Sequence, residues 1–325
     1  MFCQLEILRD YLPSSVRRFL DEKPESLDET YERILREIKK PNQDHARRLL
    51  QCLVVAIRPL QVKELAEVLA IDFDDTDEIS KLNPSWRWDD QERALLTSCS
   101  SLIAIVDTGD SRVVQFSHFS VKEYLTSARL ATSNQDVSRY HVALKPAHTI
   151  LGQACVSVLL ELGDDDSPGD VDNHGPLAIY SARYWVRHAQ FEDVVSCIKG
   201  MEHLFDLDKS YFGAWRLLYN IDIQPPHGTA FYYLNPRLTL SANTSLYYAA
   251  LCGFADLAEQ LIIKYPQHVN AIGGYYLTPA VAALAARHFQ VAEVLHRNGS
   301  SVEPRGLSND TPLHLMALNG DLEMV

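Results

Sequence analysis

Three segments near the carboxyl end of the sequence decide the fold: TSLYYAALCG at residues 244–253, TPAVAALAAR at 278–287 and TPLHLMALNG at 311–320. Each segment begins with a threonine, so the copies recur at a nearly constant spacing of roughly 33 residues. Self-similarity at a fixed period of roughly 20 to 50 residues is the pattern of stacked structural units. The sequence therefore predicts repeating helical units from about Pro236 to Val325.

The residues within each copy are typical of ankyrin repeats, which have a period of about 33 residues and a Thr-Pro-Leu-His-like start. The proline has a fixed φ that suits the first turn of a helix, and its missing N–H costs nothing there. Small residues such as Ala249 and Ala283 would let neighbouring helices approach closely. Gly253 and Gly320 close two of the copies, whereas the middle copy has Arg287 at that position.

A second apolar helix is expected in each complete copy, at residues 257–263 and 291–296. The turn segments 266–274 and 298–306 then occupy the place of the projecting hairpin, and Val269 and Val302 keep the same register. Because the third copy stops as its second helix should begin, the sequence predicts two full repeats and one truncated repeat. We expect the chain to be a fragment.

Upstream of the repeats, the pattern predicts helices followed by a two-stranded hairpin. Ser26 and Glu29 form an S-x-x-E capping box at the start of an amphipathic helix that ends near Pro41. More buried helices follow, then strand SLIAIV, turn DTGDSR and strand VVQF, and a closing helix over 118–130. This order predicts a winged helix, so the expected fold class is mainly α, with a small β-hairpin, a helical connector and an ankyrin solenoid.

Three runs in this order resemble one protein family: CQLEILRDYLPSSVRRFLDEKPESLDETYERILREI (3–38), RPLQVKELAEVLAID (58–72) and VVQFSHFSVKEYL (113–125). They are similar to the segment that follows the nucleotide-binding module in fungal NACHT-type (STAND) signalling NTPases with ankyrin repeats. The resemblance covers residues 2–127, and the runs 176–189 and 204–219 match the family's connector more loosely. It implies a winged helix that holds the nucleotide-binding module inactive and moves when the sensor binds its ligand.

We expect four regions on this basis. They are a helical segment that trails an NTPase module (1–40), a winged-helix domain (41–130), a helical connector (131–235) and the ankyrin repeats (236–325).

The sequence favours a non-catalytic function. An NTPase phosphate loop ends in Gly-Lys-Ser/Thr, and none of the 14 glycines precedes a lysine. We therefore predict no enzyme activity, catalytic residue or cofactor within this chain. Two alternatives remain open: a regulatory tail of an ATP- or GTP-hydrolysing parent whose P-loop lies upstream, and an independent ankyrin adaptor.

Other candidate sites have simpler explanations. His141, His148 and Cys155 are spaced by seven, too far apart along a helix for one metal ion. The acidic segment 164–173 lacks the bidentate glutamate of a calcium loop. His118, Ser120 and Glu123 could suggest a nucleophile and its base, but Ser120 and Glu123 fit a capping box better. We predict no metal site.

Charge and composition restrict the partners. The net charge of −13 opposes contact with nucleic-acid phosphates. No apolar stretch approaches the ~20 residues of a membrane-spanning helix, and the amino terminus lacks the pattern of a signal peptide. Six widely spaced cysteines indicate reduced core thiols in a cytoplasmic protein.

The expected partners are a protein bound on the ankyrin surface and, in a full-length protein, the NTPase module itself. Ankyrin geometry places contacts at the hairpin tips and at exposed positions of the first helices. The predicted partner-binding residues are Tyr247, His268, Asn270, Gly274, Val281, Glu303, Arg305 and His314.

Overall fold

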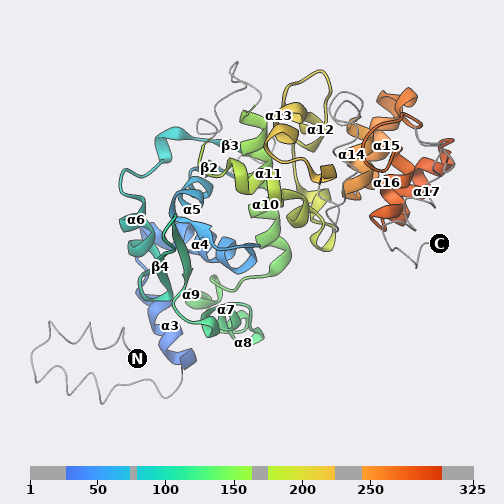
Figure 1. The fold of residues 1–325 in the computed structure, drawn as a ribbon. Helices are drawn as coiled ribbons and strands as arrows, with labels where there is room; N and C mark the ends of the chain where they lie inside the picture. Colours follow the sequence, from blue (N-terminus) through green and yellow to red (C-terminus); the bar gives the residue numbers. More distant parts are fainter. Residues whose placement is uncertain (1–26, 74–78, 163–174, 224–243, 302–325) are drawn as a thin grey trace, which may run out of the picture. The chain divides into compact units, whose positions relative to one another are not determined.

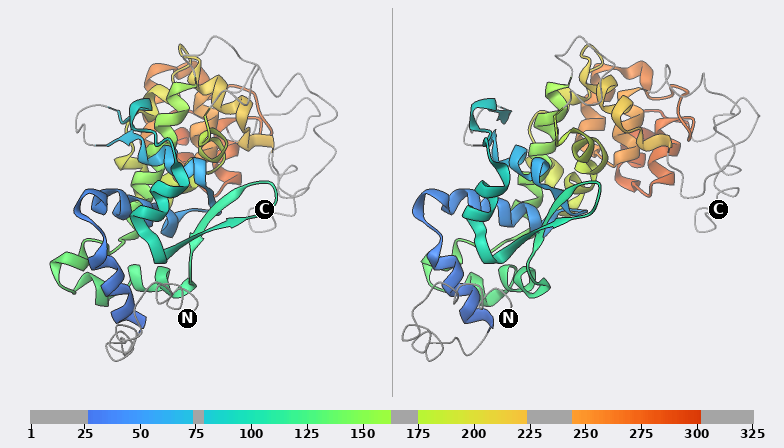
Figure 2. Two further views of the ribbon diagram at one scale, coloured as in Figure 1. Left: turned by 90° about the vertical axis from the view of Figure 1, so that its left-hand side faces the viewer. Right: turned by 60° about the vertical axis from the view of Figure 1, so that its left-hand side comes forward.

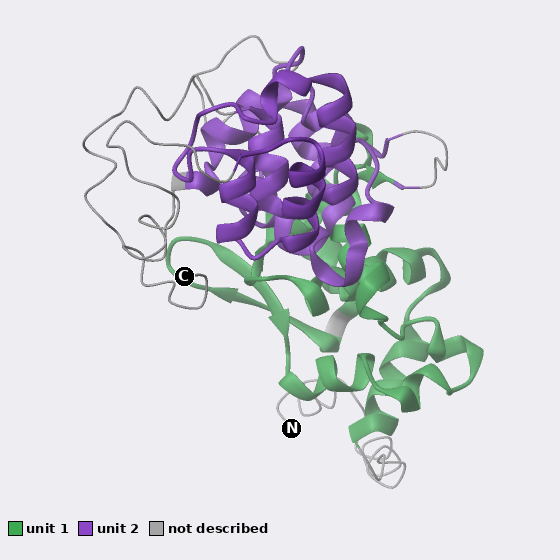
Figure 3. Cartoon of the chain, turned by 90° about the vertical axis from the view of Figure 1, so that its right-hand side faces the viewer, with its two compact units in different colours: residues 1–72, 82–151 green, residues 73–81, 152–325 purple. Residues whose placement is uncertain are grey.

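The computed structural model describes residues 27–73, 79–162, 175–223 and 244–301. It is mainly helical, with two small sheets (Figure 1). The chain divides into two compact units, residues 1–72 with 82–151 and residues 73–81 with 152–325 (Figure 3). The predicted capping box at Ser26, the acidic segment 164–173 and the third repeat copy lie outside the described residues.

Within its described residues, the first unit starts with helix α3 and contains the three-stranded sheet. Its elements are α3 (Leu27–Glu37), η2 (Lys40–Asn42), α4 (Gln43–Val55), β1 (Leu60–Gln61), α5 (Val62–Leu69), β2 (Ile71–Asp72), η3 (Pro84–Trp86), α6 (Gln91–Cys99), η4 (Ser100–Leu102), β4 (Ile103–Asp107), β5 (Arg112–Phe116), α7 (Phe119–Leu125), α8 (Ala128–Ala131) and α9 (Gln135–Ser138). β2 pairs with β3 (Lys81–Leu82), and α10 (Leu144–Glu161) leads into the second unit.

The main sheet has three antiparallel strands in the order β1-β5-β4. β4 and β5 form the predicted hairpin, with Ile103 opposite Phe116 and Asp107 opposite Arg112, and both views of Figure 2 show it as a two-stranded ribbon. The two-residue strand β1, which the sequence did not suggest, pairs Leu60 with Val114. The helix–strand–helix–helix–hairpin order confirms the winged-helix prediction.

Apolar residues from its helices and strands form the core of the winged helix. α4 and α5 contribute residues whose side chains are fully buried, and the hairpin and α7 close the core from the other side. These residues include Leu49, Leu50, Leu60, Leu65, Val68, Leu95, Val114, Val121 and Leu125.

The predicted closing helix over 118–130 is wrong in its continuity, because it breaks at Thr126. Ser127 accepts a hydrogen bond from the Leu130 N–H and thereby caps a separate short helix, α8. The predicted cap at Ser120 is also displaced. The His118 side chain accepts from the Ser120 N–H, so α7 begins earlier than the S-x-x-E pattern suggested.

The second unit contains helices throughout its described residues. They are α11 (Ala178–Ala189), η6 (Phe191–Cys197), α12 (Met201–Leu204), α13 (Tyr211–Leu218), η7 (Ile221–Ile223), α14 (Ser245–Cys252), α15 (Ala255–Lys264), η9 (Pro266–His268), α16 (Pro279–Ala285) and α17 (Phe289–Arg297). We call α11 to η7 the connector, α14 with α15 the first helical pair, and α16 with α17 the second helical pair.

The two helical pairs repeat each other, and Thr278 takes the place in the second pair that Thr244 has in the first. These threonines cap their first helices through side-chain oxygens that accept from the N–H groups of Tyr247 and Val281. The first helices contact each other, and each packs against its own second helix. The small residues of the repeat pattern therefore let neighbouring helices pack closely, as the sequence predicted, and the threonine caps are a further feature of both pairs.

Candidate partner-binding surface

The segment between the two helical pairs, residues 265–278, is the part of the predicted binding surface that the structure describes. We call it the inter-pair loop. It starts with η9, and then Gly274 and Leu277 adopt positive φ angles of 73° and 68°. The Gly273 N–H donates to the Leu277 carbonyl at 2.7 Å, which closes a tight turn before the Thr278 cap.

Three of the predicted partner-binding residues lie in the inter-pair loop. His268 is half-buried and stacks on Tyr265 with 5.2 Å between ring centroids, while its buried Nδ1 atom finds no hydrogen-bond partner among the described residues. Burial lowers the pKa of His268 below its usual value. Asn270 and Gly274 belong to the same loop, so the structure brings these three positions together. The exposed side chain of Ile272 lies between them.

Asn270 has a structural role that the sequence did not reveal. Its side-chain nitrogen donates to the Gly299 carbonyl at 3.0 Å, and its side-chain oxygen accepts from the Ser301 N–H at 2.8 Å. These bonds join the inter-pair loop to the segment that follows α17. Asn270 thus ties two successive loops together, whatever it contacts on a partner.

The expectation that Tyr247 and Val281 are exposed is wrong. Their side chains are 1% and 0% exposed, respectively. α14 is packed against α15 and α16 and contacts the connector through Tyr247 and Tyr248, and α16 is packed between α14 and α17. Helices enclosed on several sides cannot present these positions to a partner. Glu303, Arg305 and His314 fall in the part of the chain that the structure leaves undescribed.

Asp222, in η7 of the connector, was missed by the sequence analysis although it contacts the inter-pair loop. Its Oδ2 atom accepts from the Tyr275 N–H at 2.9 Å, and its Oδ1 atom accepts from the Tyr247 hydroxyl at 2.5 Å. The carboxylate is only 4% exposed. Burial and the neighbouring Asp222 charge raise the pKa of Tyr247 well above its usual value, so the hydroxyl stays protonated and donates. No local pattern marks this contact, because its partners are far apart in the sequence.

The connector covers the first helical pair with aromatic side chains. Trp185 and Trp215 are fully buried with 5.2 Å between their ring centroids, and Phe254 lies 5.4 Å from Trp185. Trp215 also donates from its indole nitrogen to the Ala182 carbonyl at 3.0 Å. The connector aromatics therefore form a core together with the first helical pair.

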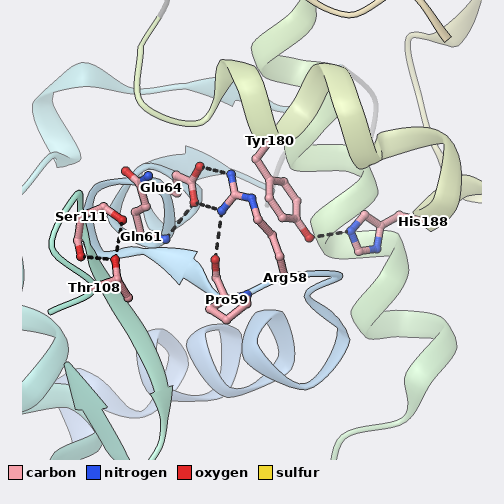
Figure 4. Close-up of polar contacts among 8 residues, drawn as sticks. All are labelled: Arg58, Pro59, Gln61, Glu64, Thr108, Ser111, Tyr180 and His188. Carbon is pink, nitrogen blue, oxygen red and sulfur yellow. Dashed lines mark hydrogen bonds and ion pairs between the residues drawn. The ribbon is translucent and has the colours of Figure 1, made fainter. Parts of the chain in front are cut away.

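Polar contacts reinforce that packing. The Gln190 side chain donates to the Cys252 carbonyl at 2.8 Å, and the Tyr248 hydroxyl donates to the Asn220 side-chain oxygen at 2.6 Å. Within the connector, the buried Tyr180 hydroxyl and His188 lie 3.0 Å apart (Figure 4). The first helical pair and the connector thus form one packed body.

Two buried carboxylates position α5 within the winged helix. The Arg58 guanidinium makes two bonds to Glu64, of 2.6 and 2.7 Å, while Glu64 also accepts from the Gln61 N–H (Figure 4). Arg87 forms a second such fork on Glu67. Bidentate Arg–carboxylate pairs of this kind fix orientation as well as distance. They hold the segments before β1 and after η3 against α5.

An acidic cleft of about 380 Å³ lies between the starts of α5 and α6 and the β4–β5 turn. Asp89, Asp90, Glu92 and Asp110 line it, together with Lys63 and Arg112. Arg112 pairs with Glu92, and the Asp90 side chain accepts from the Arg93 N–H at the start of α6. The cleft therefore carries a surplus of negative charge.

The His118 and Ser120 side chains, considered as a catalytic pair, do meet in the structure. The Nδ1 atom of His118 lies 2.6 Å from the Ser120 hydroxyl, which is also 2.7 Å from the Tyr31 hydroxyl. These contacts cap α7 and join it to α3. Among the described residues, no three His, Cys, Asp or Glu side chains converge as metal ligands do.

The described cysteines are free thiols. Cys52, Cys99, Cys155 and Cys252 are buried, as the prediction of core thiols requires, whereas Cys197 is exposed. Burial raises the pKa of Cys52 to about 12, so its thiol stays protonated and unreactive near neutral pH. No helix within the described ranges is long and apolar enough to cross a bilayer.

Comparisons with known proteins agree with the fold of the first unit. Residues 31–136 match the family described as GPI inositol-deacylase, winged helix domain. The chain therefore contains a winged-helix domain of the GPI inositol-deacylase type.

A curated relative extends the similarity along most of the chain. Azaphilone pigments biosynthesis cluster protein L of Monascus ruber is 31% identical over 300 residues, which is 87% of this chain. The aligned region is 61% of that relative's own length, so the chain spans less than two thirds of it. No solved structure matches.

Proposed function

We propose that the chain is a non-catalytic regulatory and protein-binding portion of a NACHT-type (STAND) signalling NTPase. In this proposal, ankyrin repeats sense a protein partner, and the connector couples them to an autoinhibitory winged helix. The observation that carries the proposal is the regular repetition of two helical pairs, the first of which is buried against the connector. Repeat units bury their cores only against neighbours and need a capping element at the end of the stack.

The details of the helical pairs support ankyrin repeats. Each first helix starts at a threonine cap, and Pro279 occupies the first turn in the second pair. Gly253 ends α14 in a left-handed conformation, and Arg287 takes the same conformation at the equivalent position of the second pair. The starts of α15 and α17 keep the same offset as the two threonines. The inter-pair loop lies before the second pair, which is the position at which ankyrin domains present their hairpins.

Charge supports a protein partner over a nucleic acid. A winged helix that binds DNA inserts the second helix of its helix-turn-helix into the major groove. In this chain that helix is α6. Asp90 and Glu92 stand at its start, beside an acidic cleft. Phosphates would be repelled there, and the net charge of −13 has the same effect at long range.

The NTPase module of this proposal lies outside the chain, upstream of the winged helix. The relative from Monascus ruber is longer than the aligned region, which leaves room for further modules in that protein. Its name refers to an azaphilone pigment biosynthesis cluster and states no activity. The alternative is an independent ankyrin adaptor. A Walker-type loop in the reading frame upstream of Met1 would favour the NTPase parent, and a stop codon there would favour the adaptor. We place either protein in the cytoplasm.

Peptide selection on the purified chain tests partner binding directly. A displayed random-peptide library would be panned on residues 1–325, and the affinity of enriched peptides measured by calorimetry. Ile272→Asp, at an exposed position of the inter-pair loop, should weaken binding by at least about tenfold, because a charge replaces apolar contact area.

Ile263→Asp is the matched control, since Ile263 is also strongly exposed but lies on α15. It should leave the affinity unchanged. A library without any enriched peptide, or equal losses in both variants, would contradict binding through the inter-pair loop.

A further inference from the structure

The connector ends, within the described residues, at the base of the inter-pair loop. Asp222 belongs to η7 and accepts one hydrogen bond from α14 and one from the loop, as described above. The Tyr247 hydroxyl in turn accepts from the Tyr276 N–H at 3.1 Å. Two backbone amides of the loop, at Tyr275 and Tyr276, are therefore satisfied by the buried Asp222–Tyr247 pair.

These bonds depend on one another. The Tyr247 hydroxyl has a single proton, which it gives to Asp222, so it can accept from Tyr276 only with its remaining lone pairs. If the loop moves away, both amides lose their acceptors and the Asp222 carboxylate loses a donor. Asp222 and Tyr247 are buried, and leaving buried polar groups with fewer hydrogen-bond partners is unfavourable. The contact is thus expected to open or close as a whole.

Gly274 presses the loop onto the same tyrosine. A Cβ atom built at Gly274 would clash with Cζ of Tyr247, and the residue also has a positive φ. The loop is therefore seated directly on the ring whose hydroxyl binds Asp222. Any displacement at Gly274 must move either the loop or Tyr247.

Asp222 is also anchored on its own side. Its N–H donates to the Asn220 side-chain oxygen at 3.0 Å, and the same oxygen accepts from the Tyr248 hydroxyl. Arg216 of α13 donates to that hydroxyl and lies over the Tyr248 ring. A short chain of contacts thus links Asp222 to the connector helix α13.

We propose that Asp222 and Tyr247 form a latch that couples displacement of the inter-pair loop to the connector. A partner that binds the loop breaks the contact between Asp222, Tyr247 and the loop. The helices η7 and α13 of the connector then become more mobile, so that binding at the loop changes the connector. The regulatory role of the latch rests on the proposed partner binding at the loop. The coupling between loop and connector can be tested without a partner.

Amide hydrogen exchange on the full chain tests the coupling. Gly274→Ala displaces the loop, and peptides that cover residues 211–223 should then exchange at least about tenfold faster. Gly299→Ala is the matched control. It places the same Cβ at a similar positive φ, but nothing lies within 4 Å of that position. The control should change exchange around residue 299 and around Asn270, which bonds the Gly299 carbonyl, but not in residues 211–223.

A double-mutant cycle identifies the residue that transmits the effect. Asp222→Ala alone should accelerate exchange in both the loop and residues 211–223, and Gly274→Ala should add nothing further in residues 211–223 in that background. The proposal is wrong if Gly274→Ala matches Gly299→Ala in the connector, or if the two effects add.

A milder pair of variants keeps the test decisive if Gly274→Ala does not fold. Tyr247→Phe removes only the latch hydroxyl, whereas Tyr265→Phe removes a hydroxyl that bonds Asp206 of the connector outside the latch. Only Tyr247→Phe should accelerate exchange at Tyr275 and Tyr276, and equal exchange in both variants would overturn the latch. A failed peptide selection would leave these results unaffected, so the two proposals fail separately.

Discussion

The two helical pairs share their caps and their repeat register, but they differ in what they pack against. The first pair has Tyr247 and Tyr248 where the second has Val281 and Ala282. The two tyrosines face the connector, with Tyr248 in contact with Phe212 and Trp215. Equivalent positions of the two pairs thus carry different side chains, and those of the first pair match its contact with the connector.

The second difference concerns the turn between the helices of each pair. Gly253 and Phe254 form the turn in the first pair, and Arg287 and His288 form it in the second. Both turns place their first residue in the left-handed region, although only glycine adopts it without a steric penalty. The second pair therefore has a less favourable backbone conformation at Arg287. It also has the titratable His288 where the first pair has the apolar Phe254.

The largest effect is expected when the first pair is made to resemble the second at the connector. Tyr248→Ala should lower the free energy of unfolding of the second unit by about 3–5 kcal/mol, because it leaves a cavity between buried aromatic rings. Urea denaturation followed by tryptophan fluorescence measures this, since Trp185 and Trp215 lie in the same cluster. Ile263→Ala, at a strongly exposed position of α15, serves as the control. Equal losses would show that the connector contact contributes nothing special.

The next effect concerns the glycine of the first turn. Gly253→Ala should destabilise the second unit by roughly 1–3 kcal/mol, because alanine is strained at a φ of 82°. Its Cβ would also lie 2.6 Å from the ring of His288. Gly213→Ala provides a control of opposite sign. Gly213 lies within α13 with open space around it, so alanine should stabilise the helix by up to about 1 kcal/mol.

The reverse substitution should relieve strain in the second turn. Arg287→Gly is expected to stabilise the second unit by about 1 kcal/mol, since the residue has a φ of 63°. Arg287→Ala removes the same side chain but keeps a Cβ, and it should bring no comparable gain in the midpoint of denaturation. If both variants gave the same midpoint, side-chain contacts and not backbone conformation would decide this position.

The smallest expected effect is a pH dependence of stability that the second turn has and the first turn lacks, because the second turn contains a histidine. Burial lowers the pKa of His288 below its usual value of about 6.5. The unfolded chain therefore takes up its proton first as the pH falls below 6.5, and the folded state loses stability in that range. His288→Phe, which copies Phe254 of the first turn, should weaken the loss between about pH 7 and pH 5. Burial also lowers the pKa values of His148 and His268, so these residues still contribute to the loss of stability at low pH in the variant. An unchanged pH profile would contradict this assignment.

Much of the local structure was predictable from the sequence because its signals are local. The helices that begin after Thr244 and Thr278, the helices α4 and α5 and the β4–β5 hairpin all follow from the repeat pattern, periodicity and turn residues. The exceptions also have local causes. Ser127 starts a new helix where periodicity suggested continuation, and His118, not Ser120, caps α7.

The candidate binding surface was only partly predictable. The position of the inter-pair loop follows from the repeat register, so His268, Asn270 and Gly274 could be assigned to it. The exposure of Tyr247 and Val281 could not be judged from the register, because it depends on which helices pack around α14 and α16. Asp222 was missed altogether, since nothing in IDI at residues 221–223 indicates that its carboxylate is buried under another helix.

By itself, the sequence determined the repeat period, the winged-helix order and the acidic charge, because each arises from residues close together or from simple composition. Only the tertiary structure decided that the connector covers the first helical pair, that Tyr247 and Tyr248 of this pair are buried, and that Asp222 binds the inter-pair loop. The two bonds of Asp222 join residues 25 and 53 positions apart, and the Gln190–Cys252 bond joins residues 62 positions apart. Their energies depend on burial and on geometry between elements, which no local pattern of side chains specifies.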